Sequence, residues 1–343
     1  MTRNLVFVQT NNPAGNQIQV YDRAEDGALT LAETVDTGGN GGRNEGGDGD
    51  PLSSQGSLHY DPHHRLLIAV NAGSDTVSVL ELGDDHLYLQ QVLPSGGTFP
   101  VSVSVHGELL YVLNGHGTGA ITGYRITDGK LDPIADSTRS LNLTPATGPT
   151  QFLNSPAQIG FTPDGRQLVI TTKLNGSHID VFAVAEDGRP SDTFVANPAG
   201  TPAPFGFTFD NHGRLVLTDA GADTLSTHTI HPDGTVTPVA SQLSGQMATC
   251  WVVHAAGNFY VDNAGSDVLV GFHIDAAGTP TKFTQVPTRA TPIDLVGTRD
   301  GRFLYAEVGG AGGVDGFRIN PDGTLTQIVT LSNINGLQGI ALT

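Results

Sequence analysis

The chain has 343 residues, with 34 acidic and 16 basic side chains and a formal net charge of −18 at pH 7. This charge argues strongly against a nucleic-acid partner and against anionic membranes, because phosphate binding needs surfaces of lysine and arginine. The single cysteine, Cys250, excludes an intrachain disulfide and a cysteine-based zinc site.

The N-terminus and the hydropathy pattern bear on localisation. Three residues separate Met1 from the first predicted strand, Leu5–Thr10. This leaves no room for a signal peptide, and no apolar run is long enough to span a membrane. We therefore expect a soluble, cytoplasmic protein.

Short apolar segments punctuated by Gly, Pro, Asn and Asp run along the whole chain, and long helical patterns are absent. This pattern indicates an all-β fold. Three strands are predicted first, at Leu5–Thr10, Gln17–Tyr21 and Leu29–Val35. A polar loop with seven glycines follows over 38–54, and loops of this length are usually lids or disordered.

Six sets of four strands are predicted after this loop, over 55–93, 100–135, 155–196, 205–240, 249–286 and 293–329. A second long loop covers 136–154. One further strand, Leu337–Leu342, remains at the C-terminus.

The sets repeat at a regular distance. Phe161, Phe209, Val253 and Gly297 precede equivalent turns, and their separations are 48, 44 and 44 residues. This period is typical of propeller blades of four strands. The C-terminal strand would complete the N-terminal set and so close the ring. The prediction is a seven-bladed β-propeller of four-stranded antiparallel blades, one domain over 1–343.

The segment GFTPDGRQLVITTKLNGSHIDVF (160–182) resembles the repeat of the lactonase-type seven-bladed propellers. This group includes the propeller-type 6-phosphogluconolactonase and the 3-carboxymuconate lactonizing enzyme. Three further segments resemble a bacterial subgroup of this family: SSQGSL (53–58), AVNAGSDTVSVL (69–80) and ATCWVV (248–253). The resemblance covers essentially the whole chain. It implies hydrolysis or cyclo-isomerisation of a lactone or small organic acid at the mouth of the central channel.

The sequence departs from the family pattern within this blade. Where the typical pattern has Pro-Arg-His and Asn-Glu, this chain has Pro156, Ala157 and Gln158, and then Thr172 and Lys173. A cation for the acid group of the substrate, a general base and a carboxylate are therefore replaced. The alternative hypothesis is a non-catalytic propeller that binds a ligand or a protein.

Candidate site residues lie where the inner strands begin and the second strands end, because these positions surround one mouth of a propeller channel. Four of them could carry catalysis: Lys173, Glu307, Asp294 and His116. Seven could bind substrate: Gln55, Asn71, Asn114, Gln158, Trp251, Asn263 and Gln338. The amides could instead bond turns or adjacent blades, and Trp251 could be inter-blade core.

Lys173 is one of only three lysines. It could bind a carboxylate or phosphate, or act as a base if desolvation lowers its pKa. The alternative is a salt bridge to an acidic residue of a neighbouring blade.

No metal or cofactor is predicted. His59, His63 and His64 cluster on a turn at the face opposite the proposed mouth, where a solvated turn is expected. The spacing of Glu45, Asp48 and Asp50 is not that of a known cation site. The expected partner is a small-molecule substrate, and the expected state is a monomer.

Overall fold

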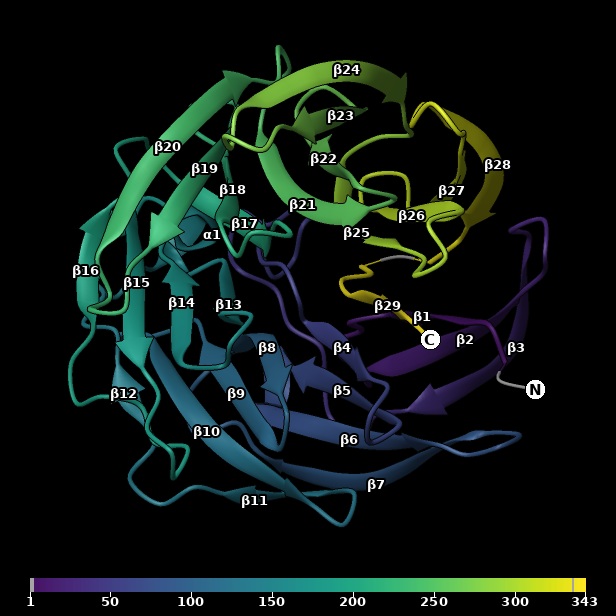
Figure 1. Cartoon of the computed structure of the whole chain (residues 1–343). Coiled ribbons are helices and arrows are strands. Elements are labelled where there is room, and N and C mark those ends of the chain that lie inside the picture. The colour runs from purple at the N-terminus through teal and green to yellow at the C-terminus, as the bar shows by residue number, and fades with distance from the viewer. Residues whose placement is uncertain (1–2, 335) are drawn as a thin grey trace.

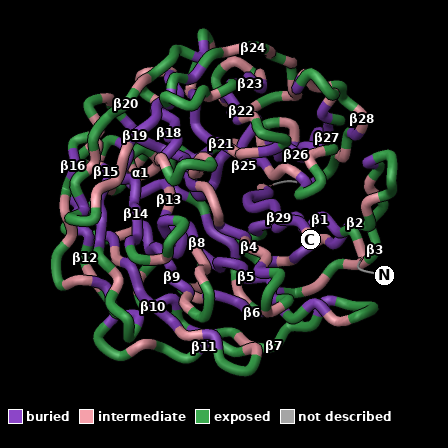
Figure 2. Tube along the Cα trace, viewed as in Figure 1, coloured by how far each residue is buried: buried purple, intermediate pink, exposed green. Residues whose placement is uncertain are grey.

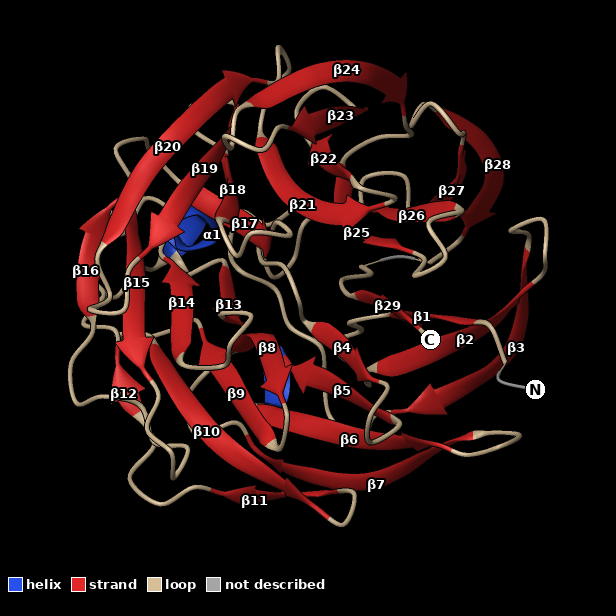
Figure 3. Cartoon of the chain, in the orientation of Figure 1, coloured by secondary structure: helices blue, strands red, loops and turns tan. Residues whose placement is uncertain are grey.

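The computed structural model describes residues 3–334 and 336–343. Seven antiparallel sheets stand around a central axis and form a closed ring (Figure 1). Six sheets have four strands each, and the third carries a short fifth strand. In the described residues helix is confined to short segments in the loops (Figure 3), as the absence of long helical patterns predicts.

The blades are numbered 1 to 7 along the chain. Blade 1 contains β1 (Leu5–Gln9), β2 (Gln17–Arg23), β3 (Leu29–Asp36) and the C-terminal β29 (Ile340–Leu342). Blade 2 contains β4 (Leu58–Asp61), β5 (Leu66–Asn71), β6 (Thr76–Leu82) and β7 (Leu87–Pro94). Blade 3 contains β8 (Pro100–His106), β9 (Leu109–Asn114), β10 (Ala120–Thr127), β11 (Lys130–Pro133) and the short β12 (Arg139–Ser140). Blade 4 contains β13 (Gln158–Phe161), β14 (Gln167–Thr171), β15 (His178–Ala183) and β16 (Val195–Pro198).

In the last three blades, the strands again follow chain order from the axis outward. Blade 5 contains β17 (Pro204–Phe209), β18 (Leu215–Asp219), β19 (Thr224–Ile230) and β20 (Val236–Leu243). Blade 6 contains β21 (Thr249–Ala255), β22 (Asn258–Asn263), β23 (Val268–Ile274) and β24 (Pro280–Pro287). Blade 7 contains β25 (Pro292–Gly297), β26 (Phe303–Val308), β27 (Gly313–Ile319) and β28 (Leu325–Ser332). The helical segments are η1 (Ala72–Ser74), η2 (Gly148–Thr150) and α1 (Gln151–Asn154).

The C-terminal strand closes the ring as the sequence predicts. β29 pairs antiparallel with β1, and Ala341 lies opposite Phe7. Closure gives both strands a hydrogen-bonded neighbour and so removes a large exposed sheet edge. The strand is shorter than the predicted Leu337–Leu342, because Gly339 adopts φ +116° and the chain before it turns toward the axis.

Burial follows the position of each strand in its blade (Figure 2). Every residue of β1 and β5, the second strands of blades 1 and 2, is buried, whereas the outer β3 is mostly exposed. A strand that packs against neighbouring blades on both faces needs a continuous apolar run. The second strands therefore carry the strongest apolar signal in the sequence.

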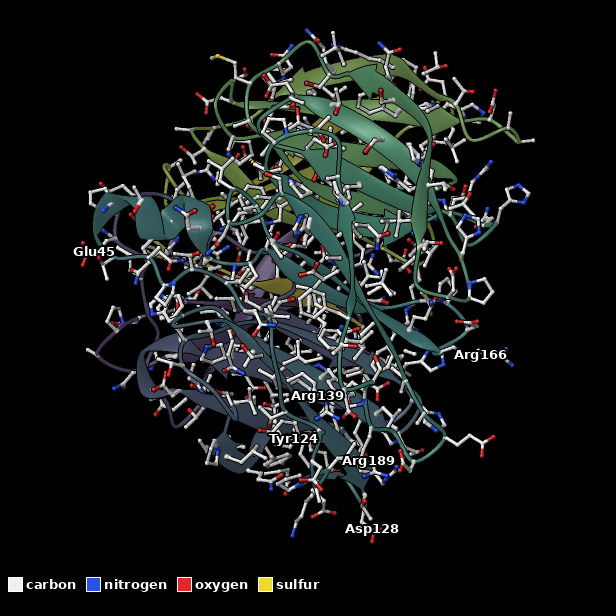
Figure 4. The ribbon with its side chains drawn as sticks, turned by 90° about the vertical axis from the view of Figure 1, so that its left-hand side faces the viewer. Glu45, Tyr124, Asp128, Arg139, Arg166 and Arg189 are labelled. Carbon is white, nitrogen blue, oxygen red and sulfur yellow. The ribbon has the colours of Figure 1, made fainter. Side chains whose placement is uncertain are left out.

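The ring has two distinct faces, which Figure 4 shows edge-on. Glu45 of the long loop and helix α1 lie at one face, and Arg166 in the β13–β14 turn lies at the other. The second predicted loop, 136–154, is partly ordered into β12, η2 and α1. Among the described residues, no helix is both long and apolar enough to cross a membrane.

Candidate functional site

The glycine-rich loop ends in five buried residues, 50–54, which we call the plug. Hydrogen bonds from blade 6 and from the C-terminal segment help to fix the plug to the ring. Leu52 N donates to Gln338 Oε1 (2.8 Å), and Gln338 Nε2 donates to Ser54 O (3.1 Å). The indole N–H of Trp251 also donates to Ser54 O (2.9 Å). Blade 6 and the closing segment of the chain therefore hold the plug over the central channel.

Close backbone approach explains part of the glycine content of this loop. A Cβ on Gly41 would lie 2.0 Å from Asn11 O. The Asn11 side chain in turn bonds both backbone groups of Gly42, at 2.8 and 3.0 Å. The loop is therefore ordered and packed in this structure.

We predict that Gly41→Ala loosens this loop, because the added methyl group has no space beside Asn11. Limited proteolysis should then cleave the variant faster than wild type within 38–54. Gly15→Ala is the matched control, since a Cβ there meets nothing within 4 Å and, like Gly41, Gly15 does not have a positive φ. Equal cleavage of the two variants within 38–54 would contradict the prediction.

Lys173 follows β14 and points its ammonium group at the plug. Its Nζ donates to Ser53 O and Ser53 Oγ (2.7 Å each). It also donates to Phe152 O (2.8 Å) and to Ser155 Oγ (3.0 Å). All four acceptors are neutral oxygens. Burial lowers the pKa of Lys173 to about 7, although the nearby Asp50 carboxylate opposes this shift.

Asp50 stands in the plug and joins Lys173 electrostatically to a group of buried carboxyls. Burial raises the pKa of Asp50 to about 6, against the attraction of the Lys173 charge. The charge of Asp50 in turn raises the pKa of Asp262, Asp294 and Glu307. We call these four residues, Asp50, Asp262, Asp294 and Glu307, the axial acid group.

Each of the other three axial acids accepts one backbone hydrogen bond. Trp251 N donates to Asp262 Oδ1 (3.2 Å), and Gly339 N donates to Glu307 Oε2 (2.9 Å). Asp294 Oδ1 accepts from the N–H of the next residue (3.0 Å). The second carboxyl oxygen of each finds no donor within hydrogen-bond distance among the described residues.

Burial dominates the titration of these acids. It raises the pKa of Asp294 to about 7, and it raises the pKa of Asp262 and Glu307 well above the usual carboxyl range. The Asp294 charge raises the pKa of Glu307 further. The group therefore retains protons near neutral pH, a condition that suits a general acid or base.

His116 lies at the outer rim of the same mouth. Its ring stacks on Phe99, with centroids 3.8 Å apart, and its Nε2 is 2.9 Å from Asn44 Oδ1. Burial lowers its pKa. A small pocket beside it is lined by Asn154, Ser155 and Asn175, among others. Because Ser155 Oγ also accepts from Lys173, this pocket and the ammonium group share one side chain.

The sequence-predicted amides make internal hydrogen bonds. Gln158 bonds both backbone groups of Phe207 (2.7 and 3.0 Å), and Gln55 does the same with Val252. Asn71 joins blades 1 and 2 through Asn16 (3.0 Å). Gln158 and Asn71 thus bond neighbouring blades, whereas Gln55, which precedes blade 2, bonds blade 6 and not an adjacent blade.

Two further predicted amides bond locally. Asn263 accepts from Thr249 Oγ1 (2.6 Å) and donates to Val268 O (3.0 Å). Asn114 donates to Ser95 O (3.1 Å). A role for these amides in substrate binding stays a prediction.

The structure thus brings the predicted catalytic residues together in part. Ser155 bonds Lys173 and lines the pocket beside His116, and Asp294 and Glu307 interact with each other electrostatically. Asp50 lies close enough to both sides to couple them electrostatically. Sequence reasoning considered Asp50 only as a possible cation ligand with Glu45 and Asp48, and it missed Asp262. The signal for Asp50 was the change from glycine-rich sequence to DPLSS (50–54).

A larger cavity of about 700 Å³ opens elsewhere, between the N-terminal segment and turns of blades 2 and 7. Arg3, Arg65 and Arg299 line it. Its one carboxylate side chain, Asp84, is 94% exposed. The cavity offers charge for an anion, whereas the buried acids and the buried lysine lie at the plug.

Family comparison agrees with this fold. The family model described as "Lactonase, 7-bladed beta-propeller" matches residues 6–254, which is more than half of the chain. The chain therefore belongs to the lactonase family of seven-bladed β-propellers. A search of curated protein sequences finds no match.

Solved structures share the architecture over their full length. The periplasmic gluconolactonase PpgL of Pseudomonas aeruginosa is 18% identical, with 99% of both chains covered and a TM-score of 0.79. A candidate 6-phosphogluconolactonase of Bacteroides uniformis is 18% identical, with full coverage of both chains and a TM-score of 0.76. One from Bacteroides fragilis is 17% identical, covering 99% of this chain and 98% of its own, with a TM-score of 0.75. At these identities the likeness establishes the fold alone.

Proposed function

We propose that the protein hydrolyses the lactone of a small organic acid at the channel mouth, beneath the plug. The observation that carries this proposal is the buried, electrostatically coupled set of Lys173 and the axial acid group, with pKa values of about 7 for both Lys173 and Asp294. Membership of the lactonase family supports the reaction class. Family neighbours described as gluconolactonases support a sugar-acid lactone as the first substrate class to test.

The chemistry needs a cation for the carbonyl oxygen and a base for water. Lys173 would stabilise the negative charge that develops on the carbonyl oxygen during attack. Ionised Asp294 would accept a proton from the attacking water, because its second oxygen is not engaged by a donor. The carbonyl carbon gains a bond to the water oxygen, and the ring C–O bond breaks. The alkoxide leaving group takes a proton from protonated Glu307, and the product is a hydroxy acid.

Substrate entry requires the plug to move. In the closed position Ser53 occupies two of the four acceptor positions around Lys173. When the plug withdraws, the ammonium group loses these partners and can bind a carbonyl or carboxylate oxygen in their place. Loop 38–54 would then act as the lid that admits substrate and excludes water.

The proposal predicts turnover of at least one member of a panel of sugar-acid lactones and muconate-like acids. Asp294→Asn should lower kcat about 10²–10⁴-fold, the usual effect of losing a general base. Asp180→Asn is the matched control, because Asp180 is also buried with a pKa of about 7 but lies in β15 of blade 4. Absence of turnover across the panel, or an equal effect of both variants, would overturn the assignment.

One observation favours the second candidate function, a binding propeller without catalysis. The plug fills the mouth, and Gln55, Gln158 and Gln338 all have internal partners. A binding module would hold its ligand at the rim, beside His116, with the plug still closed. Ligand binding that leaves the protease sensitivity of loop 38–54 unchanged would support this function over hydrolysis.

A further inference from the structure

A second cluster of chemically active side chains lies on two turns between inner and second strands. His63 and His64 belong to the β4–β5 turn of blade 2, and Glu108 belongs to the β8–β9 turn of blade 3. One ligand atom of each residue lies within 4.8 Å of the other two. Equivalent turns lie at the face that carries Arg166 in Figure 4, opposite the plug. The cluster is therefore separate from the proposed lactonase site.

The distances within the cluster suit a tetrahedral metal ion. His64 Nε2 and Glu108 Oε2 are 3.1 Å apart. Two tetrahedral ligands at about 2.0–2.2 Å from Zn²⁺ stand roughly 3.3 Å from one another. An ion could therefore lie between these two atoms, and a ligand atom of His63 lies within 4.8 Å of both. The His63 and His64 rings are edge-on, with centroids 4.6 Å apart, so both rings lie beside the same point.

Asp61 holds His63 and His64 in place. Its side chain is only 8% exposed. One of its oxygens accepts the backbone N–H of His63 (2.9 Å), and the other bonds His64 Nδ1. A metal-binding histidine commonly donates its second ring N–H to a carboxylate, which fixes the tautomer and leaves the other nitrogen free for the ion. The Asp61 bond to Nδ1 leaves Nε2 of His64 directed at Glu108.

The local electrostatics also favour a cation. Asp61 and Glu108 place two carboxylate groups beside the His64 ring. These two carboxylates would attract a divalent ion to Nε2.

We propose that His63, His64 and Glu108 form a Zn²⁺ site that bridges blades 2 and 3, with Asp61 as the positioning residue. Two histidines and one carboxylate leave a fourth tetrahedral position for water. The bound ion would tie two neighbouring turns together and stabilise the folded ring by mass action.

Titration calorimetry of the chelator-treated full chain with Zn²⁺ alone tests the site, and Co²⁺ absorption reports the geometry. Wild type should bind one high-affinity ion and gain thermal stability. His63→Ala and Glu108→Gln should each weaken this binding at least about tenfold. Asp61→Asn should also weaken it about tenfold while the Co²⁺ spectrum still reports tetrahedral binding.

His86→Ala is the matched control. His86 is another surface histidine beside a carboxylate, with Nδ1 3.2 Å from Glu33 Oε2, and it stands outside the metal-compatible cluster. This variant should bind Zn²⁺ as wild type does. His63 and Glu108 are both exposed, so their variants should fold. Lack of saturable binding by wild type, or undiminished binding by His63→Ala, would overturn the proposal.

Discussion

Lys173→Ala is expected to lower kcat for the best lactone substrate about 10²–10³-fold, the usual loss when a group that stabilises an oxyanion is removed. The variant should also lose roughly 2–5 kcal/mol of stability. Truncation leaves a cavity, and it leaves Ser53 O and Phe152 O without the donor that they share. Steady-state kinetics and thermal unfolding measure the two effects separately.

Two further experiments distinguish a catalytic role of Lys173 from a structural one. A primary alkylamine that fits the cavity of Lys173→Ala should restore part of kcat, because it returns the cation to the mouth. Lys282→Met is the control, since Lys282 bonds Ser244 O (2.7 Å) on the outer strand of blade 6. Its kcat should match wild type. If lactone turnover by Lys173→Ala equals that of wild type, Lys173 has no part in the chemistry.

The replacement of the family's usual residues has a structural counterpart in this chain. Where the typical pattern places a glutamate at the end of the second strand, Lys173 lies buried and bonds the plug. The carboxyl group that acts on Lys173 comes from the plug, Asp50, which is in turn coupled to Asp294 and Glu307 of blade 7. A buried lysine and buried carboxyl groups are thus both present. The carboxyl groups, however, do not come from the blade that carries the glutamate in the family pattern.

The fold could be predicted from sequence because each blade repeats its own local signals. The turns that follow Phe209, Val253 and Gly297 recur at one period, and strands that follow one another within a blade pair with each other. The closing strand was predictable by elimination, since six complete sets left three strands and one. Gln55 was wrongly placed in a strand: Gly56 adopts φ +81°, and β4 begins only at Leu58.

The site was only partly predictable, because its contacts join residues far apart in the chain. Lys173 and Glu307 were found because charged residues are unusual where second strands end. Asp262 was missed because the candidate positions were the ends of the second strands, and in blade 6 that position is Asn263. Asp50 lies in a polar glycine-rich loop, and nothing local shows that the loop folds back across the axis. Its burial depends on Gln338, which lies 288 residues later in the chain.

The axial acid group should make stability depend on pH in a direction opposite to that of paired surface acids. In the folded chain the pKa of Asp294 is about 7, against an ordinary value of 3.8. Between these values the folded state binds more protons than the unfolded state does. Its contribution to stability is therefore complete below about pH 4 and is lost as pH rises through about 7. Glu307 has the same sign, because its pKa is also raised.

The measurement compares chemical denaturation of wild type and of the double variant Asp294→Asn, Glu307→Gln between about pH 4 and pH 7.5. Wild type should lose at least about 1 kcal/mol more than the variant over this range. The difference is needed because His228, whose pKa burial lowers to about 4, contributes with the opposite sign. Asp48→Asn is the control, since its side chain is 91% exposed, and its slope should follow wild type. If the free energy of unfolding varies with pH in the same way for wild type and the double variant, these acids do not retain protons in the folded ring. The assignment of Asp294 as the general base would then be wrong.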